Sequence, residues 1–312
     1  MADITASMVK ELRDRTQAGM SDCKNALVEA SGDMEKAVEI ILKKGLVKAA
    51  GKGGRIATEG EVATWISPDA RKGVVVEINT QTDFVARGDE FKRFVAQVLE
   101  VAQKAPKGAD IAKLEHAGTK KPLDQMRQEL TAKTGENTVI RRWDAIEGRS
   151  PRSYVHSYVH MGGKLGVLIE VEAPTDAARE NAELRQMTDH WAMQVCSMKP
   201  LAVSREDFTP EQIAKQKEIF EAQLKEEGKP QAAWPKILEG KVSKWFTEVT
   251  LLGQDNVWDP PAGPVDKIRQ ELGKKLGGEV KIQAFIRYAL GEGIDKPPQE
   301  DLAAEVAKTI GH

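Results

Sequence analysis

The chain has 312 residues, of which 40% are hydrophobic and 30% charged, so it can bury one or two cores but is too polar for a membrane protein. Lys and Arg total 46 against 48 Asp and Glu, and without an overall basic field direct binding of nucleic acid is disfavoured. Cys23 and Cys196 each lie in an apolar helical pattern, which predicts buried thiols and neither a disulfide framework nor a cysteine-rich metal site.

The first five residues show no basic region followed by an apolar stretch. No run of about 18 apolar residues, the length that spans a bilayer, occurs in the sequence. We therefore expect a protein that stays in the cytoplasm and does not insert into a membrane.

Residues 5 to 45 repeat the helical spacing of apolar residues three times, which predicts three short helices. Thr5 is the expected cap of the first helix and Ser21 of the second, while Ser31-Gly32-Asp33 opens the third. Gly45 can end the third helix in the left-handed conformation. The residues expected to face inward are Met8, Val9, Leu12, Cys23, Ala26, Leu27, Ala30, Met34, Ala37, Val38, Ile41 and Leu42.

Residues 46 to 59 are rich in glycine and basic side chains, which predicts a flexible connector. Gly51-Lys52-Gly53-Gly54 invites comparison with a phosphate-binding loop. It lacks the G-x-x-x-x-G-K-[ST] spacing and no strand precedes it, so a linker is the better interpretation.

From residues 61–65 the pattern changes to period two, and Pro68-Asp69 turns the chain into a strand that ends at Thr80. A corner over residues 81–91 leads from this strand into a helix for which Asp89 is the expected N-cap. The apolar stripe of that helix is Phe91, Phe94, Val95, Val98, Leu99 and Ala102. The first half then ends with a shorter helical segment containing Leu123, Met126 and Leu130, a stop at Gly135, and a strand from Asn137 to Ile146.

The corner recurs 93 residues later, where Thr175-Asp176 takes the place of Thr82-Asp83. Thr-Asp in both copies favours short polar side chains that satisfy free N–H groups at the start of a helix. The second copy has Ala177 in place of Phe84, so the corner does not need an aromatic residue to form. Phe84 is then either a core anchor or an apolar wedge offered to a partner beside an acidic neighbour.

The second half repeats the strand order with residues 153–160, a turn at Gly162-Gly163 and a strand over 164–173. His156 and His160 lie four apart on a strand, about 13 Å, too far to share one metal ion. The helix that follows has Leu184, Met187, Trp191 and Val195 inward and stops at Pro200.

Residues 204–246 interrupt this half with a predicted antiparallel helical hairpin, opened by the capping box Thr209-Pro210-Glu211-Gln212. Its apolar residues exceed what two helices need to cover each other, which favours an association surface. A short helix around Ile268 and Leu272, a strand over 280–288 and an amphipathic helix over 299–310 complete the chain.

The run Thr82-Asp83-Phe84-Val85-Ala86-Arg87 resembles the signature of bacterial elongation factor Ts, the family of nucleotide-exchange factors of elongation factor Tu. The resemblance extends over nearly the whole chain, and the segment from Leu12 to Leu27 carries the family's ubiquitin-associated-like pattern. The departures from the family are Gln17 for the usual Gly, Ser21 for a frequent Met, and Asp255-Asn256 for the usual Pro-Phe.

The resemblance implies binding to elongation factor Tu-GDP and promotion of GDP release, with Asp83-Phe84 inserted near the partner's magnesium and phosphate site. It implies no cofactor or metal on the chain itself, and self-association through residues 204–246. The residues it places at the partner are Thr82, Asp83, Phe84, Val85 and Arg87 at the corner, Leu12 and Met20 near the amino terminus, His160, Met161 and Gly162 in the second half, and Leu302 in the last helix. From the residues alone, Met20 can equally be a methionine that fills a gap in the core.

We expect an α+β fold with a three-helix ubiquitin-associated-like domain, a core of two repeated halves that each hold a three-stranded antiparallel sheet, an inserted hairpin and a C-terminal helix. The expected boundaries are 1–46 for the docking domain, 47–60 for the linker, 61–148 for the first half, 149–203 and 247–294 for the second half, 204–246 for the hairpin and 295–312 for the last helix.

An enzyme needs a nucleophile with a base, paired carboxylates in a cleft or a ligand cluster, and no such set can be assembled from this sequence. The other alternative is an adaptor that binds a ubiquitin-like ligand through the first 45 residues alone. An exchange factor would need Asp83 and Phe84 instead.

Overall fold

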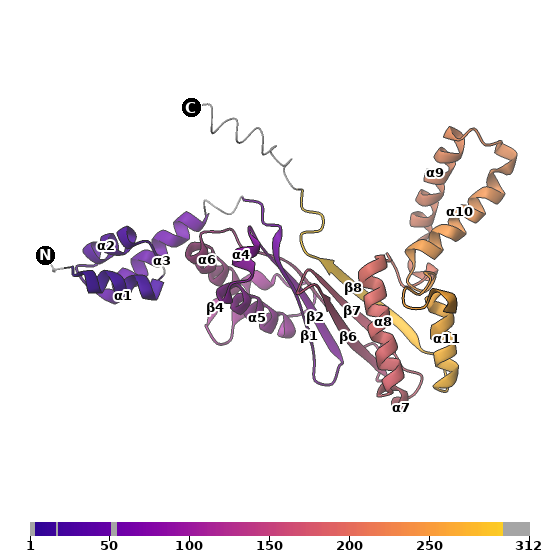
Figure 1. Cartoon of the computed structure of the whole chain (residues 1–312), viewed down its shortest axis with the longest axis horizontal. Coiled ribbons are helices and arrows are strands. Elements are labelled where there is room, and N and C mark those ends of the chain that lie inside the picture. The colour runs from indigo at the N-terminus through magenta and orange to yellow at the C-terminus, as the bar shows by residue number, and fades with distance from the viewer. Residues whose placement is uncertain (1–3, 17, 51–54, 296–312) are drawn as a thin grey trace. The chain divides into compact units, whose positions relative to one another are not determined.

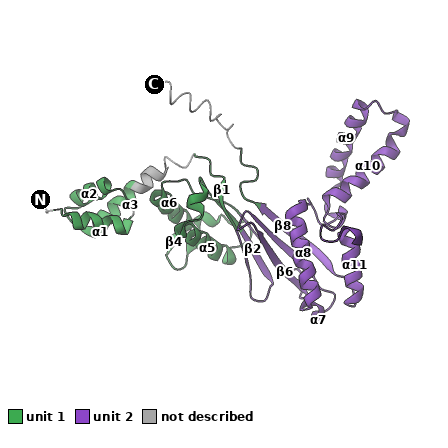
Figure 2. Cartoon of the chain, viewed as in Figure 1, with its two compact units in different colours: residues 1–62, 76–142, 289–312 green, residues 63–75, 143–288 purple. Residues whose placement is uncertain are grey.

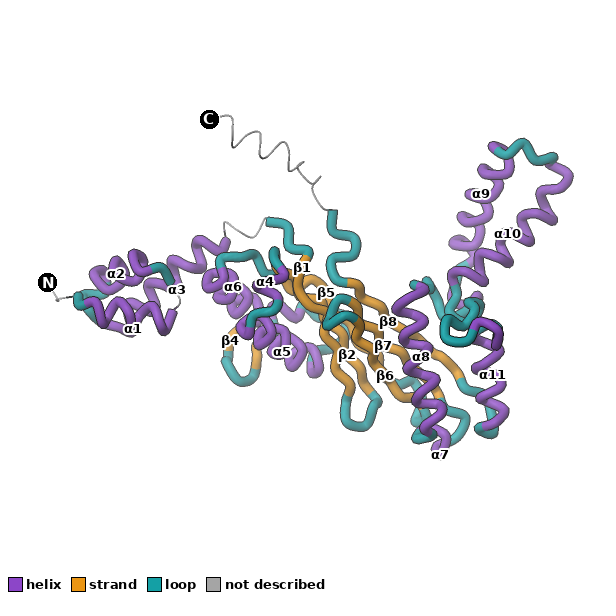
Figure 3. The backbone as a smooth tube through the Cα atoms, in the orientation of Figure 1, coloured by secondary structure: helices purple, strands orange, loops and turns teal. Residues whose placement is uncertain are grey.

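The computed structural model describes residues 4–16, 18–50 and 55–295, and the chain divides into two compact units (Figure 2). Unit 1 comprises residues 1–62, 76–142 and 289–312, and unit 2 comprises residues 63–75 and 143–288. Helices and strands are mixed in both, which confirms the α+β class (Figure 3). None of the described helices combines the length and apolar character needed to cross a membrane.

Unit 1 begins with the three predicted helices, α1 (Ala6–Thr16), α2 (Met20–Glu29) and α3 (Met34–Ala50). They share a core of their own because their apolar stripes face one another. The buried residues of that core are Val9, Leu12, Cys23, Ala26, Leu27, Ala30, Ala37 and Ile41. The hydroxyl oxygen of Thr5 accepts a hydrogen bond from the backbone N–H of Met8 at 3.3 Å, as expected for a cap.

Two predicted helix ends in this region are wrong. The N-cap of α2 is Gly19, without a side-chain hydrogen bond, so Ser21 lies within the first turn. Helix α3 continues past Gly45 to Ala50, because one interior glycine costs only about 1 kcal/mol and the residues after it are mostly good helix formers. Residues 47 to 50 of the predicted linker thus belong to α3.

Strands β1 (Glu59–Ile66), β2 (Lys72–Thr80) and β5 (Val139–Glu147) form a three-stranded sheet in the order β1-β2-β5. The central position of β2 agrees with the burial of every residue from Gly73 to Thr80. The predicted hairpin and its turn are confirmed, and β5 begins two residues later than predicted. Helices α5 (Asp89–Lys104) and α6 (Leu123–Thr134) follow β2 in sequence, with a small pair of strands between them, β3 (Glu115–His116) and β4 (Lys121–Pro122). These two-residue strands are too short to show a period in the sequence.

A fully buried carboxylate, that of Glu77, anchors β2 within unit 1. It accepts hydrogen bonds from Arg141 Nη1 at 2.8 Å, Arg142 Nε at 2.5 Å and the backbone N–H of Gly291 at 2.8 Å. Burial by itself raises the pKa of the Glu77 carboxyl, but the bonds from Gly291, Arg141 and Arg142 outweigh it and hold the pKa below its usual value. The side chain therefore links β2, β5 and the segment after residue 289.

In unit 2, strands β6 (Ser153–His160), β7 (Leu165–Glu172) and β8 (Lys281–Ala289) form the second three-stranded sheet in that order. β6 and β7 are antiparallel and pair Ser153 with Glu172 and His160 with Leu165. Alternate side chains of these strands pack with helices α8 (Ala182–Met198) and α11 (Val265–Lys275). The core they form includes Tyr154, Val167, Ile169, Val171, Leu184, Trp191, Val195, Leu272 and Ile282.

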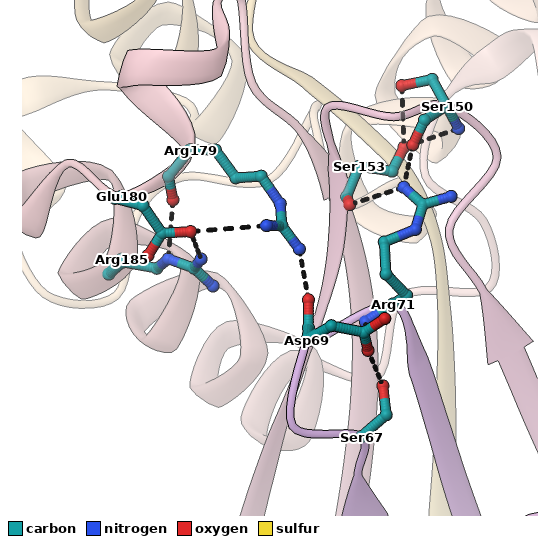
Figure 4. A network of polar contacts seen from close by, with 8 residues as sticks. All are labelled: Ser67, Asp69, Arg71, Ser150, Ser153, Arg179, Glu180 and Arg185. Carbon is teal, nitrogen blue, oxygen red and sulfur yellow. Dashed lines mark hydrogen bonds and ion pairs between the residues drawn. The ribbon is translucent and has the colours of Figure 1, made fainter.

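The turn between β1 and β2 is held within unit 2 by arginine side chains (Figure 4). Arg71 donates from Nη2 to the carbonyl oxygen of Gly148 at 2.7 Å and from Nη1 to that of Ser153 at 3.1 Å, and it also bonds the carbonyl of Ser150. Arg179 donates to the carbonyl oxygen of Asp69 in the same turn. The β1–β2 turn is thus hydrogen-bonded to residues that lie about 80 positions later in the chain.

The inserted hairpin consists of α9 (Pro210–Glu226) and α10 (Trp234–Val249), which lie side by side in Figure 1. The predicted capping box is confirmed: Gln212 N–H donates to Thr209 Oγ1, and Thr209 N–H donates to Gln212 Oε1. The two ends of the insertion meet, because Leu252 N–H donates to the carbonyl oxygen of Val203 at 3.0 Å. Short 3-10 turns occur at η1 (Ile111–Lys113), η2 (Arg205–Asp207), η3 (Gln231–Ala233) and η4 (Pro260–Ala262). The helix predicted over 299–310 lies outside the described residues.

Candidate functional site

The corner after β2 is a one-turn helix, α4 (Asp83–Ala86), that presents Phe84 to solvent. The Phe84 side chain is 86% exposed, so the interpretation of this residue as a core anchor is wrong. Val85 is half-buried and Ala86 is buried, and these two residues seat the turn on the protein. An aromatic side chain that is almost fully exposed can be removed from water by a binding partner, and this burial is favourable.

The cap of α4 is Thr82, whose hydroxyl oxygen accepts from the backbone N–H of Val85 at 3.3 Å. Asp83 is the first residue of the turn and makes no cap. Its carboxylate instead accepts from Arg87 at 2.8 Å, in an exposed i,i+4 ion pair. Exposed pairs of this kind contribute only about 0.3 to 0.5 kcal/mol. Both charges are therefore available to a partner at little cost.

Helix α5 begins directly after this corner, and its N-cap is Gly88 rather than the predicted Asp89. Asp89 lies in the first turn, where its negative charge interacts favourably with the helix dipole. Next to it, the hydrogen bond from Lys133 on α6 holds the pKa of the Glu90 carboxyl below its usual value. The start of α5 is thus fixed to α6.

Glu136, which follows α6, binds the cap residue of α4. Its Oε1 accepts from the Thr82 hydroxyl at 2.8 Å, and its Oε2 accepts from the Thr82 backbone N–H at 3.0 Å and from Thr80 Oγ1 at 3.2 Å. Beside it, Asn137 N–H donates to Gln81 Oε1 at 2.8 Å. Sequence reasoning missed Glu136, because nothing in the run around it signals a partner more than 50 residues away.

The second copy of the corner has the same cap and lacks the wedge. Thr175 Oγ1 accepts from Ala178 N–H at 3.1 Å and begins the one-turn helix α7 (Asp176–Arg179). Ala177 occupies the position of Phe84 and is also exposed. The repeat predicted from the sequence is therefore confirmed at the level of the threonine cap, and the second copy shows that this cap suffices without an aromatic residue.

In unit 2, the predicted contact residue His160 ends β6, and Met161 and Gly162 follow it in the turn to β7. All three are exposed, with Met161 at 71%. The turn is closed by a hydrogen bond from Lys164 N–H to the carbonyl oxygen of His160 at 3.1 Å. The phenol of Tyr158 lies 2.8 Å from Nδ1 of His160 and fixes the orientation of the ring. This turn offers an apolar tip beside an imidazole.

Of the two contact residues predicted in the N-terminal helices, Met20 is 48% exposed and Leu12 is fully buried. Leu12 packs in the core of the three helices, so its side chain presents no surface to a partner. It fits the apolar face that its helical spacing predicted, and we do not retain it as a contact residue. Leu302 lies outside the described residues.

The described residues 4–16, 18–50 and 55–295 contain no group of three or more His, Cys, Asp or Glu side chains placed to hold a metal ion. His156, considered above for a shared metal, is 2.9 Å from Asp189 Oδ1. Cys23 and Cys196 are buried free thiols, as predicted, and burial raises the pKa of Cys196. What the corner offers chemically is an exposed aromatic side chain beside an exposed carboxylate, which suits binding to another protein.

The sequence is similar to known proteins over nearly the whole chain. The family model described as elongation factor TS matches residues 81–292. A protein named Elongation factor Ts from a Nitratiruptor species is 45% identical over 311 residues, covering 97% of this chain and 98% of that protein. Proteins of the same name from Clostridium perfringens and Rhodospirillum centenum are 41% and 40% identical, with at least 99% of each chain covered.

Proposed function

Because the chain belongs to the elongation factor Ts family of translation factors, we propose that it binds elongation factor Tu-GDP and promotes GDP release by inserting Asp83 and Phe84 beside the nucleotide site. The observation that carries this proposal is the exposure of Phe84, at 86%, on a capped and braced turn. The second copy of the corner forms without an aromatic residue, so the fold itself does not require one at this position.

The exchange follows from linkage between two ligands of one GTPase. A factor that binds the nucleotide-free GTPase more tightly than the GDP-bound form must weaken GDP binding by the same factor. No covalent step by the factor is needed. In this mechanism the chain binds neither GDP nor magnesium, and GTP replaces GDP by mass action.

Phe84 and Asp83 divide the work at the partner. The Phe84 ring enters between helices of the GTPase and exchanges its exposure to water for apolar contact, about 25 cal/mol per Å² buried. Asp83 leaves its weak pair with Arg87 and disturbs the shell of the magnesium ion. Loss of that cation removes the charge that offsets the phosphates, and GDP then dissociates. Thr82, Val85 and Arg87 contact the partner around this wedge.

The exposed turn of residues 160–162 and the exposed Met20 supply further contacts in the proposal. Each lies on an element with its own core, so these contacts add affinity without taking part in displacement. The C-terminal residue Leu302 is kept as an additional proposed contact on the strength of the family resemblance.

Release of labelled GDP from elongation factor Tu, with and without the purified chain, tests the proposal directly. We expect the chain to accelerate release and to bind no GDP itself. Tight GDP binding by the chain alone, or an unchanged release rate at saturating chain, would refute it.

Removing residues 1–50 tests the docking role of the three helices, and the cut is placed after Ala50 because α3 ends there. A tethered second contact adds affinity through effective concentration, so we expect the half-saturating concentration to rise about tenfold or more. The maximal rate of GDP release should stay within about twofold. An equal loss at saturation would place these helices in the displacement step.

Deleting residues 204–246 tests the hairpin as the surface of self-association. The ends of the insertion meet at Val203 and Leu252, so a short glycine linker can close the chain with the core intact. The hairpin exposes Ile219 at 45%, and we expect its removal to lower the oligomeric mass measured by light scattering. GDP release should change by less than about threefold. An unchanged mass would show that the hairpin is not the assembly surface.

A further inference from the structure

The carboxylate of Glu136 makes three hydrogen bonds to the two threonines that precede Phe84. Two of them go to Thr82, at 2.8 Å from its hydroxyl and 3.0 Å from its backbone N–H, and one to the Thr80 hydroxyl at 3.2 Å. Hydrogen bonds to an ionised acceptor are roughly twice as strong as those between neutral groups. Gly135, with φ of 78°, ends α6 in the left-handed conformation immediately before Glu136.

The turn that carries Phe84 cannot hold its shape through its own backbone bonds. α4 has only four residues, far fewer than a helix needs to be stable in water. Its geometry therefore depends on the cap. The hydroxyl of Thr82 has one proton, which it donates to Glu136, and this leaves a lone pair directed at Val85 N–H. Glu136 thus fixes the rotamer in which Thr82 acts as a cap.

The internal repeat provides the comparison. Glu136 stands three residues before β5, and the residue at the same distance before β8 is Gly278. In the described part of the chain, no carboxylate is hydrogen-bonded to Thr175, although Thr175 makes the same cap bond as Thr82. A capped turn therefore forms without a carboxylate bound to its threonine. The carboxylate of Glu136 is bound in the copy that carries the exposed aromatic residue.

We propose that Glu136 is a positioning residue for exchange, which holds the Thr82 cap so that Phe84 meets the partner at a fixed angle. The inference rests on the proposed function of Phe84. Glu136 does not touch the nucleotide site in this proposal. It acts through Thr82. Without Glu136, Phe84 can adopt other orientations, and the productive one must be recovered at each encounter with the partner.

The test measures GDP release from elongation factor Tu over a range of factor concentrations. Urea unfolding of each variant gives its folded fraction, and the rates are expressed per folded molecule. Glu136→Ala should lower the maximal rate about tenfold, and Glu136→Gln, which keeps one acceptor oxygen, should fall between it and the unaltered protein. Glu129→Ala is the matched control. It removes a carboxylate of α6 that bonds Lys121 at 2.7 Å and leaves the corner untouched, so its maximal rate should stay within about twofold.

Combining Glu136→Ala with Phe84→Ala separates this inference from the proposed function. If Glu136 acts through Phe84, the double variant should release GDP within about twofold of Phe84→Ala alone. A further loss of about tenfold would overturn the positioning role. So would full activity per folded molecule in Glu136→Ala when Phe84→Ala is inactive. Full activity in both single variants would instead refute the wedge itself.

Discussion

Phe84→Ala is expected to lower the maximal rate of GDP release by at least about tenfold, the loss typical of an anchor residue buried at the centre of an interface. The free energy of unfolding should change by no more than about 0.5 kcal/mol, because the side chain is exposed in the free protein. The two measurements are nucleotide release at saturating factor and urea unfolding. A large loss of release rate with an unchanged free energy of unfolding would show that Phe84 contributes to the complex and not to the fold.

Asp83→Ala should also reduce exchange, and Asp176→Ala is its matched control. Both carboxylates are exposed at the first position of a one-turn helix, and the caps are the preceding threonines, Thr82 and Thr175. Neither substitution removes a cap, so both should leave stability within about 0.5 kcal/mol. Only Asp83→Ala should slow release. Equal effects of the two variants, or a stable and fully active Phe84→Ala protein, would remove this corner from the mechanism.

Glu77→Gln is expected to destabilise the protein by about 3 kcal/mol at neutral pH. The substitution leaves Arg141 and Arg142 beside a buried neutral group, and breaking a buried ion pair from one side costs roughly 3 to 5 kcal/mol. We take the lower end because both arginine side chains are partly exposed, at 21% and 31%. Urea unfolding measures the difference.

The effect of pH follows from the lowered pKa of Glu77. A carboxyl whose pKa is lower in the folded state stabilises the fold above its unfolded pKa, about 4.3, and loses this contribution as pH falls through the folded value. The stability gap between the unaltered protein and Glu77→Gln should therefore narrow in acid. A gap that stays constant from neutral pH to about pH 2 would contradict the assignment.

Glu170→Gln is the control that the repeat supplies, because Glu170 is the fully buried counterpart of Glu77 on β7. It accepts one backbone bond, from Arg149 N–H at 2.7 Å, and its nearest cation is the Arg149 side chain at 3.4 Å, which is 60% exposed. We expect a smaller loss than for Glu77→Gln, about 1 to 2 kcal/mol. A larger loss at Glu170 would show that the paired arginines are not what stabilises Glu77.

Much of the fold could be predicted from the sequence, because periodicity and turn residues are local signals. The strand alternation at residues 61–65, the capping box at Thr209 and the stop at Gly135 all correspond to observed elements. The C-terminal end of α3 and the caps of α2 and α5 could not be predicted. At those ends two or three neighbouring residues satisfy the same backbone groups at similar cost, and the packing chooses among them.

The candidate site divides in the same way. The motif around Phe84 could be read directly from the sequence. The exposure of its side chain rules out a core anchor, one of the two interpretations that Ala177 left open, and its role as a wedge at a partner stays a prediction. Glu136 and the arginines of Glu77 were invisible, because their partners are brought together by the strand order and not by spacing in the chain. The resemblance to the family pointed to Leu12 as a contact residue, whereas the helical period had already placed it inside.

The strand order of the second sheet determines when that sheet can form during synthesis. β7 ends at Glu172, and its second neighbour, β8, begins only at Lys281. A chain that grows from its amino terminus therefore carries β7 with one unpaired edge while α8 to α11 are made, and such edges recruit other strands. Helix α8 follows at once and covers the apolar face of β6 and β7. Chains released before residue 281 keep the open edge, and we expect them to aggregate more readily than the full-length protein.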